Sequence, residues 1–192
     1  MKELRLGSIC FSIFFLLACQ SEQKTAYTVC NPIDLSYRFA LDTLSRRAAA
    51  DPTVVLFKDK YYLFASKSGG YWYSDDLAAW NFIETNEIPT EEWAPTAIAM
   101  GDTLYFMSSS QSSSVFYSTH PLTGKWEIAR DTMEMALHDP AFFLDDDNRL
   151  YLYWGCSNTS PLYGVELNKK DFSVISKIHK VVYSNKEING WK

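Results

Sequence analysis

The chain has 192 residues and a formal net charge of −5 at pH 7, and 47% of its residues are hydrophobic. This length suits a single domain with a sizeable core, and the mildly acidic balance without a basic patch argues against nucleic acid as a partner. Aromatic residues make up 16% of the sequence, and they gather in short runs that recur along the chain.

The first 18 residues are typical of a signal peptide. Lys2 and Arg5 precede an apolar run over residues 9–17, which is too short to span a bilayer. The segment Leu16-Leu17-Ala18-Cys19 resembles the bacterial lipobox, which implies cleavage before Cys19 and attachment of lipid to its thiol; the alternative is an ordinary signal peptide with a chance cysteine. Gln20, in place of Asp, favours the outer membrane. We therefore expect a lipid-anchored protein of the cell envelope, on its periplasmic or surface side.

A pattern of four short apolar runs occurs three times downstream. First runs open at Pro52, Pro95 and Pro140, and aromatic second runs follow at residues 61–64, 104–107 and 150–153. Third runs follow at residues 72–74, 116–118 and 163–165, and fourth runs begin at Trp80, Trp126 and Phe172. The step between copies is 43 to 47 residues. A period of this size with four strands per copy is the signature of β-propeller blades, each a four-stranded antiparallel sheet.

We therefore expect an all-β fold with three propeller blades. Residues 19–47 form a tether and lead-in segment, and residues 48–192 form an incomplete β-propeller with blades at about 48–86, 91–130 and 136–176. A propeller needs at least four blades. The chain is accordingly expected to be a truncated piece of a longer protein, which is a simpler explanation than assembly of three blades with another chain.

The residue before each first strand is the most informative position. The first strand of a blade lies nearest the axis, so this residue lies at the axis on one face of the disc. Asp51, Ala94 and Asp139 occupy the position, and two of the three are carboxylates directly before proline. Asp-Pro can also simply begin a strand. Two such pairs at matching repeat positions favour a functional pair that faces across the axis.

Polar hairpins between second and third strands are expected beside these aspartates. They cover residues 67–70, 108–114 and 156–160, and they are rich in hydroxyl groups. Two interpretations stay open at this stage. The hydroxyl groups could bind a sugar, or Gly and Ser could be present because they make good turns.

The spaced motifs resemble glycoside hydrolase family 43. The resemblance covers about residues 48–167 and is carried by Ala50-Asp51-Pro52, Lys60-Tyr61-Tyr62-Leu63-Phe64, Tyr73-Ser74-Asp75-Asp76-Leu77 with Trp80, Trp93-Ala94-Pro95 and Asp139-Pro140-Ala141 with the residues to Asp147. It implies a five-bladed propeller that hydrolyses arabinose-, xylose- or galactose-containing plant polysaccharides or oligosaccharides with inversion. It also implies that Asp51 is the general base, that Asp139 orients and tunes the acid, and that Trp93 packs near the sugar.

The sequence departs from the family pattern at several positions. Thr96 replaces an Asp after Ala-Pro, and His138 replaces an Ile-like residue before the third-blade Asp. The family's general acid is a Glu in blade four, and no residue here matches it, since Glu187 lies in the wrong context. The resemblance therefore implies an enzyme whose present piece is inactive alone. The rival hypothesis is a non-catalytic, lipid-anchored glycan-binding propeller, and a propeller used only for protein contacts would leave the paired Asp-Pro motifs unexplained.

Other polar features are interpreted as structural, and no metal or cofactor is expected. Residues 145–148 resemble a calcium loop but lack its full spacing and fall at a hairpin turn of the repeat. The histidines at 120, 138 and 179 lack metal-ligand spacing. Trp72, Tyr73, Trp80 and Trp126 are expected in blade cores. Cys30 and Cys156 could form a bridge in an oxidising compartment, but two free thiols are favoured.

Overall fold

The computed structural model describes residues 49–189 except 111–112, 158 and 184. The expected signal peptide, the lipidation site Cys19, the lead-in segment to residue 47 and Cys30 all lie outside the described residues. In the described part, no helix is long and apolar enough to cross a membrane.

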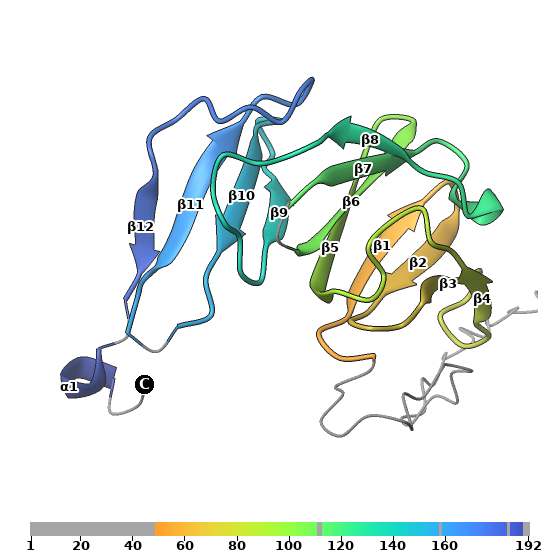
Figure 1. Cartoon of the computed structure of the whole chain (residues 1–192), viewed down its shortest axis with the longest axis horizontal. Coiled ribbons are helices and arrows are strands. Elements are labelled where there is room, and N and C mark those ends of the chain that lie inside the picture. Colours follow the sequence, from red (N-terminus) through yellow and green to blue (C-terminus); the bar gives the residue numbers. More distant parts are fainter. Residues whose placement is uncertain (1–48, 111–112, 158, 184, 190–192) are drawn as a thin grey trace, which may run out of the picture. The chain divides into compact units, whose positions relative to one another are not determined.

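The described chain forms three four-stranded antiparallel sheets, each built from consecutive strands (Figure 1). The all-β fold of propeller blades is therefore confirmed. The first sheet holds β1 (Thr53–Phe57), β2 (Lys60–Phe64), β3 (Gly70–Ser74) and β4 (Asn81–Glu84). The second holds β5 (Trp93–Met100), β6 (Thr103–Ser109), β7 (Val115–Ser118) and β8 (Glu127–Arg130), with a 3₁₀ turn η1 (Pro121–Thr123) before β8. The third holds β9 (Ala141–Leu144), β10 (Leu150–Trp154), β11 (Leu162–Leu167) and β12 (His179–Val182), followed by the short helix α1 (Lys186–Asn189).

Tight turns between first and second strands fix the register of each sheet. Lys58 and Asp59 both have positive φ, as a two-residue type I′ hairpin requires, and Phe57 pairs with Lys60. In the third sheet the Asp145 carboxylate accepts hydrogen bonds from the backbone N–H and the guanidinium of Arg149, at 2.7 and 2.9 Å. The acidic segment at residues 145–148 is thus a hairpin turn, as predicted.

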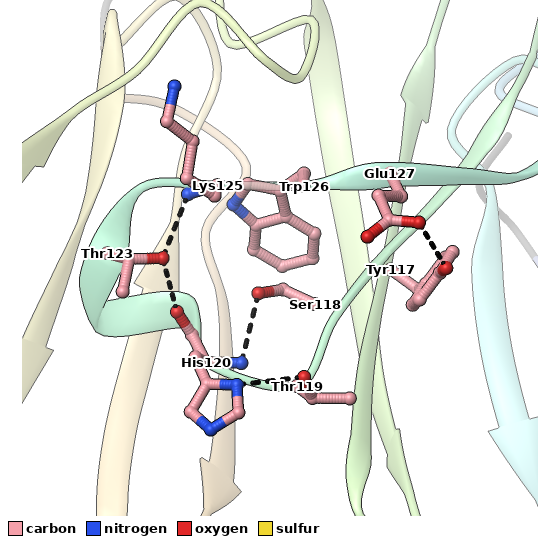
Figure 2. A pocket seen from close by; sticks show the side chains of 8 residues that line it. All are labelled: Tyr117, Ser118, Thr119, His120, Thr123, Lys125, Trp126 and Glu127. Carbon is pink, nitrogen blue, oxygen red and sulfur yellow. Dashed lines mark hydrogen bonds between the residues drawn. The ribbon is translucent and has the colours of Figure 1, made fainter.

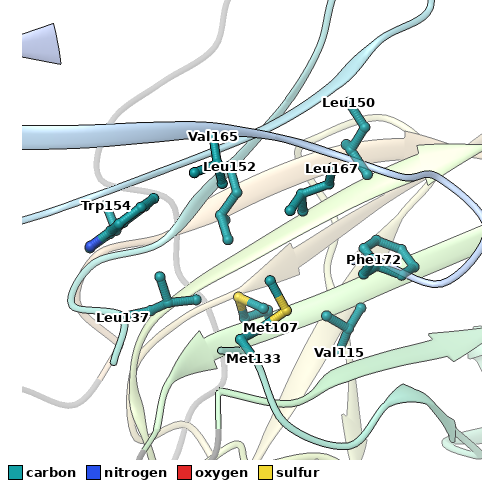
Figure 3. Close-up of a cluster of buried hydrophobic side chains, with 10 residues drawn as sticks. All are labelled: Met107, Val115, Met133, Leu137, Leu150, Leu152, Trp154, Val165, Leu167 and Phe172. Carbon is teal, nitrogen blue, oxygen red and sulfur yellow. The ribbon is translucent and has the colours of Figure 1, made fainter. Parts of the chain in front are cut away.

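The first strands of the three sheets lie side by side, β1 next to β5 and β5 next to β9. Between sheets one and two, the buried cluster consists of Phe57, Tyr62, Phe64, Tyr71, Ile88, Leu104, Phe106 and Trp126. Between sheets two and three, Figure 3 shows a second cluster of Met107, Val115, Met133, Leu137, Leu150, Leu152, Trp154, Val165, Leu167 and Phe172. A fully buried apolar side chain of this size contributes about 1.5–3 kcal/mol, so the two clusters supply most of the force that stacks the sheets.

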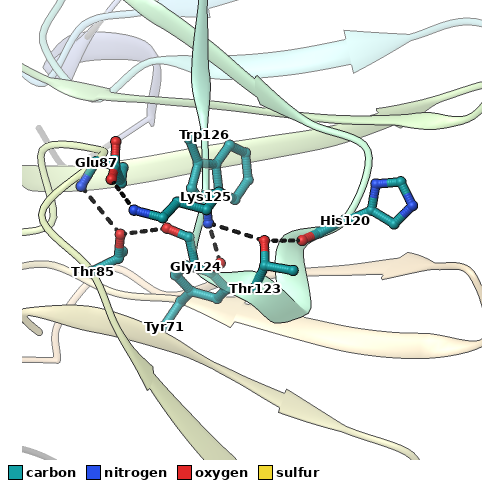
Figure 4. Close-up of polar contacts among 8 residues, drawn as sticks. All are labelled: Tyr71, Thr85, Glu87, His120, Thr123, Gly124, Lys125 and Trp126. Carbon is teal, nitrogen blue, oxygen red and sulfur yellow. Dashed lines mark hydrogen bonds and ion pairs between the residues drawn. The ribbon is translucent and has the colours of Figure 1, made fainter.

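A polar clamp joins sheet one to the turn before β8 (Figure 4). The Tyr71 hydroxyl donates to the carbonyl of Pro121 at 2.5 Å and accepts from Trp126 Nε1 at 3.0 Å. Thr85 Oγ1 donates to the carbonyl of Gly124 at 2.7 Å. Burial raises the pKa of Tyr71, so this phenol stays protonated and the clamp keeps its donor.

Phe172 and two of the four aromatic residues expected in blade cores lie elsewhere than the sequence predicts. The fourth strand of the third sheet begins at His179, so the prediction that it begins at Phe172 is wrong. Phe172 instead lies in a turn with φ of 57°, where its ring packs on Tyr105 and Phe142. Phe172 occurs where the repeat places the start of a fourth strand, but its side chain belongs to the core between sheets two and three. Trp72 and Trp126 are buried as expected, whereas Tyr73 and Trp80 are half-buried.

Candidate functional site

Asp51 lies directly before Pro52 and two residues before the start of β1, exposed to solvent and with a left-handed backbone at φ of 50°. Ser66, which is fully buried after the end of β2, donates a hydrogen bond from Oγ to Asp51 Oδ2 at 3.2 Å. The backbone N–H of Ser66 also donates to the carbonyl of Ala50 at 2.8 Å. The carboxylate predicted to be the general base is thus held from the neighbouring strand and still reaches water.

Asp139 holds the same position before β9, exposed and with φ of 49°. Its backbone N–H donates to Ser109 Oγ at 2.7 Å, and Ser109 is the last residue of β6 in the preceding sheet. On its other side the N–H of Gly155 donates to the carbonyl of His138 at 2.7 Å, which brings Cys156 beside Asp139. Desolvation, the Asp139 charge and a hydrogen bond to this carboxylate raise the pKa of the free Cys156 thiol.

Ala94 is the third residue at this repeat position, and it has φ of 44° before Pro95. We call Asp51, Ala94 and Asp139 the pre-proline residues. All three take a left-handed conformation that is uncommon for residues other than glycine, and that is best tolerated by Asp and Asn. The repeat seen in the sequence therefore extends to the backbone geometry of the residues predicted to carry the chemistry.

Trp93 begins β5, between the two aspartates. It pairs with Ser109 across the β5–β6 ladder, and Lys67 Nζ lies 4.1 Å from the centre of its ring. Lys67 Nζ also donates to the carbonyl of Glu91 at 3.0 Å. A cation on the ring is held by the electrons of the indole face, so a sugar would have to pack against Trp93 from another side.

The three predicted residues therefore gather at one end of the adjacent inner strands. Asp51 is connected through Ser66 to Ala94, because the Ala94 N–H donates to Ser66 Oγ at 2.9 Å. Ala94 follows Trp93, whose strand partner Ser109 accepts from Asp139. This continuous set of contacts runs from one carboxylate to the other through sheet two.

The polar hairpins use many of their hydroxyl groups within the protein. Ser68 Oγ donates to carbonyls within its own turn, and Ser113 Oγ donates to the carbonyl of Ser110 at 3.1 Å. Ser114 Oγ donates to the carbonyl of Asp131, and Ser157 Oγ bonds to Thr159 Oγ1 at 3.1 Å. Of the two interpretations of these loops, the structure favours turn formation for Ser68, Ser113 and Ser157, whereas Ser114 bonds to a carbonyl outside its own hairpin.

A separate hollow of about 310 Å³ lies over β7, η1 and β8, away from the pre-proline residues (Figure 2). Its polar side chains bond to one another or to nearby elements: Tyr117 donates to Glu127 at 2.5 Å, and Thr119 bonds to His120 at 2.9 Å. Lys125 forms an ion pair with Glu87 at 2.6 Å. These groups already have partners, so we interpret the hollow as part of the scaffold that supports the clamp of Figure 4.

No cluster of three or more potential metal-ligating side chains occurs among the described residues. Glu187, which sequence context already excluded as the general acid, lies exposed in α1, outside the three sheets. The chemistry that the described site can supply is that of two solvent-facing carboxylates, which can activate water and influence a neighbouring acid.

Sequence reasoning did not identify Ser66, Lys67 or Ser109 as site residues. Ser109 and Lys67 fall within hairpins that the sequence marked as polar, but their partners could not be read from composition. Alignment of the repeats could have found Ser66 and Ser109, because they occupy equivalent positions. Ser66 lies two residues after Phe64, the strand partner of Thr53, and Ser109 lies two residues after Met107, the strand partner of Thr96.

Comparisons with known proteins agree with the all-β fold of propeller blades. The sequence model of glycosyl hydrolases family 43 matches residues 43–192. No curated protein matches the sequence. Among solved structures, a novel α-L-arabinofuranosidase from Clostridium thermocellum ATCC 27405 is similar with a TM-score of 0.55 and 19% identity, over 70% of this chain and 55% of that one.

Two further structures are similar. One is described as Bacteroides ovatus xyloglucan PUL GH43B, with a TM-score of 0.55 and 16% identity over 69% of this chain and 30% of that one. The other is an exo-1,5-α-L-arabinanase from a bovine ruminal metagenomic library, with a TM-score of 0.51 and 18% identity over 70% and 55%. The chain thus spans between 30% and 55% of the length of these three structures. At these identities the structures support the fold, and the family model, which covers most of the chain, shows that the chain belongs to glycosyl hydrolases family 43.

Proposed function

We propose that the complete protein is an inverting glycosidase that acts on arabinose-, xylose- or galactose-containing plant polysaccharides or oligosaccharides. The observation that carries the proposal is the placement of two solvent-facing carboxylates, Asp51 and Asp139, at equivalent positions before β1 and β9, the inner strands on either side of β5. Family membership supports a glycan as substrate.

In this proposal Asp51 is the general base. An inverting glycosidase needs a base that activates water and a protonated acid, about 6.5 to 9.5 Å apart so that water fits between base and sugar. The exposure of Asp51 leaves room for that water, and its bond from Ser66 fixes one carboxylate oxygen. Asp139 acts on the acid: an ionised carboxylate close to another carboxyl group raises the pKa of that group, which keeps it protonated at working pH.

The general acid is proposed to come from a further blade. Both outer faces of the three-sheet stack expose apolar side chains: Val54 and Leu56 on sheet one, and Phe143 and Val181 on sheet three, each between 48% and 56% exposed. Water-exposed apolar faces of this kind favour coverage by another sheet. Two more blades would cover both exposed faces and close the ring. The present piece, which has no residue that matches the general acid, is proposed to be inactive alone.

The test is hydrolysis by the complete gene product. The protein is incubated with nitrophenyl α-L-arabinofuranoside, β-D-xyloside and β-D-galactoside and with arabinan and xylan, while proton NMR follows the anomer first released. Release of the inverted anomer is the expected result. Binding of these glycans without release would favour the non-catalytic glycan-binding alternative, and release with retention would overturn the assignment of Asp51 as a base.

We also propose that Cys19 carries lipid and holds the protein at the cell envelope, with the outer membrane favoured by Gln20. The support is the lipobox-like segment that ends at Cys19. Cells that express the full-length protein are labelled with a palmitate analogue, and the label is expected on the wild type and absent from Cys19→Ser. Equal labelling of the two proteins would contradict the anchor.

A further inference from the structure

We propose that Ser66 is a positioning residue for Asp51 that couples the general base to the next blade. The proposal rests on the proposed function, since a positioning role has meaning only if Asp51 activates water. Ser66 is fully buried, so its polar atoms depend on protein partners rather than on solvent.

The direction of each hydrogen bond at Ser66 Oγ is fixed by chemistry. The backbone N–H of Ala94 can only donate, so Oγ is the acceptor of that bond at 2.9 Å. The single hydroxyl proton is then available for Asp51 Oδ2 at 3.2 Å, where the carboxylate is the acceptor. The Ser66 hydroxyl group thus connects the backbone of sheet two to the carboxylate that precedes sheet one, so a shift of sheet two would also shift Asp51.

Ser109, the equivalent residue of the next repeat, makes one of the two bonds of Ser66, the bond from a backbone N–H. Ser109 Oγ accepts from the Asp139 N–H at 2.7 Å, which reproduces the bond between Ser66 and the pre-proline residue of the following sheet. The third repeat has Gly155 at this position, which has no hydroxyl group. Capping a backbone N–H is therefore a shared device of the first two repeats, and the bond from Ser66 to the Asp51 carboxylate is an addition to it.

A residue that only joined two sheets would affect stability alone. A residue that also orients the base would affect turnover, because a displacement of about 1 Å at a reacting group can cost about 10²-fold in rate. Ser66→Ala removes both bonds. Ser66→Thr keeps the hydroxyl group and serves as the conservative variant.

Ser68→Ala is the matched control. Ser68 is a buried serine of the same hairpin, and its Oγ bonds only to the carbonyls of Ala65 and Gly70 in the described structure, at 2.9 and 2.5 Å. Its removal is expected to lower the urea midpoint of unfolding without a matching loss of kcat.

The experiment measures kcat, KM and the urea midpoint of each variant in the complete protein, on the best nitrophenyl glycoside. Ser66→Ala is expected to lower kcat by about 10- to 100-fold with KM within about threefold of the wild type, and Ser66→Thr to recover most of kcat. Wild-type kcat in folded Ser66→Ala, or equal kcat losses in Ser66→Ala and Ser68→Ala, would overturn the positioning role while the glycosidase proposal stands. A wild type that hydrolyses none of the substrates overturns the glycosidase proposal itself, and this role with it.

Discussion

Asp51 and Asp139 share one backbone conformation, with φ of 50° and 49°, each directly before a proline that leads into an inner strand. For most residues with a side chain this conformation costs about 1–2 kcal/mol, and Asp and Asn bear it best because their short polar side chains bond locally. The backbone therefore explains why Asn is the substitution of choice at both positions.

Asp51→Asn is expected to fold and to lose turnover in the complete protein. The amide keeps the shape and tolerates positive φ, so the free energy of unfolding should change by no more than about 1.5 kcal/mol. It cannot accept a proton from water, and loss of a general base costs about 10²–10⁴-fold in rate. Asp59→Asn is the control, because Asp59 has φ of 59° in a hairpin turn and should affect neither quantity. Comparable activity of Asp51→Asn and wild type would contradict the assignment.

Tyr71→Phe is expected to destabilise the fold through the clamp of Figure 4. The variant leaves Trp126 Nε1 and the Pro121 carbonyl without their Tyr71 partner in a buried place, which costs about 1–3 kcal/mol. Urea unfolding followed by tryptophan fluorescence gives the value. Tyr117→Phe, which removes a surface bond to Glu127, should cost less than about 1 kcal/mol. An equal loss of unfolding free energy in the two variants would mean that the buried clamp contributes no more stability than the surface bond.

Asp76 makes part of the stability depend on pH. Hydrogen bonds from the N–H groups of Ala79 and Ala78 and from Ser74 hold the pKa of Asp76 below its ordinary value. A depressed folded-state pKa means that the ionised group stabilises the fold above the unfolded value, near pH 4, and that this stabilisation is lost as pH falls through the lower folded value. The wild type should therefore exceed Asp76→Asn in unfolding free energy at pH 6, and the gap should narrow from about pH 4 downward. A gap of constant size from pH 6 to pH 2 would count against this account.

The thiol of Cys156 reports on Asp139. Desolvation and the neighbouring carboxylate raise the pKa of Cys156, so a smaller fraction is thiolate at pH 8 and alkylation by iodoacetamide should be slower than for a small free thiol. Asp139→Asn removes the charge and should speed the reaction. Mass spectrometry of the peptide that holds Cys156 measures both rates. The same rate in Asp139→Asn and wild type would show that the two side chains do not interact in solution.

The repeated runs were enough to predict the fold class, because each blade is specified by local alternation and turn residues. The position of β12 was not predictable in this way, since Phe172 carries an apolar signal for packing between sheets that resembles a strand start. The equivalent positions of Asp51 and Asp139 followed from the repeat, whereas Trp93 was named from the family resemblance alone. Their roles, the blade boundaries and the lipid anchor stay predictions.

Contacts between repeats were out of reach of local reasoning. Ser66 meets Ala94 28 residues away, and Ser109 meets Asp139 30 residues away. The residues next to a serine in the sequence do not indicate such a partner, because the hydrogen bond depends on how two sheets stack. Alignment of the repeats marks the two serines as equivalent, but the partner of each is set by the tertiary arrangement of the inner strands.

The short outer strands separate the evolution of the surface from that of the site. The strands β4, β8 and β12 have four residues each and are largely exposed, whereas the described contacts between the pre-proline residues pass through β5, through Ser66 after β2 and through Ser109 at the end of β6. Insertions and substitutions at the rim can therefore accumulate without moving either carboxylate.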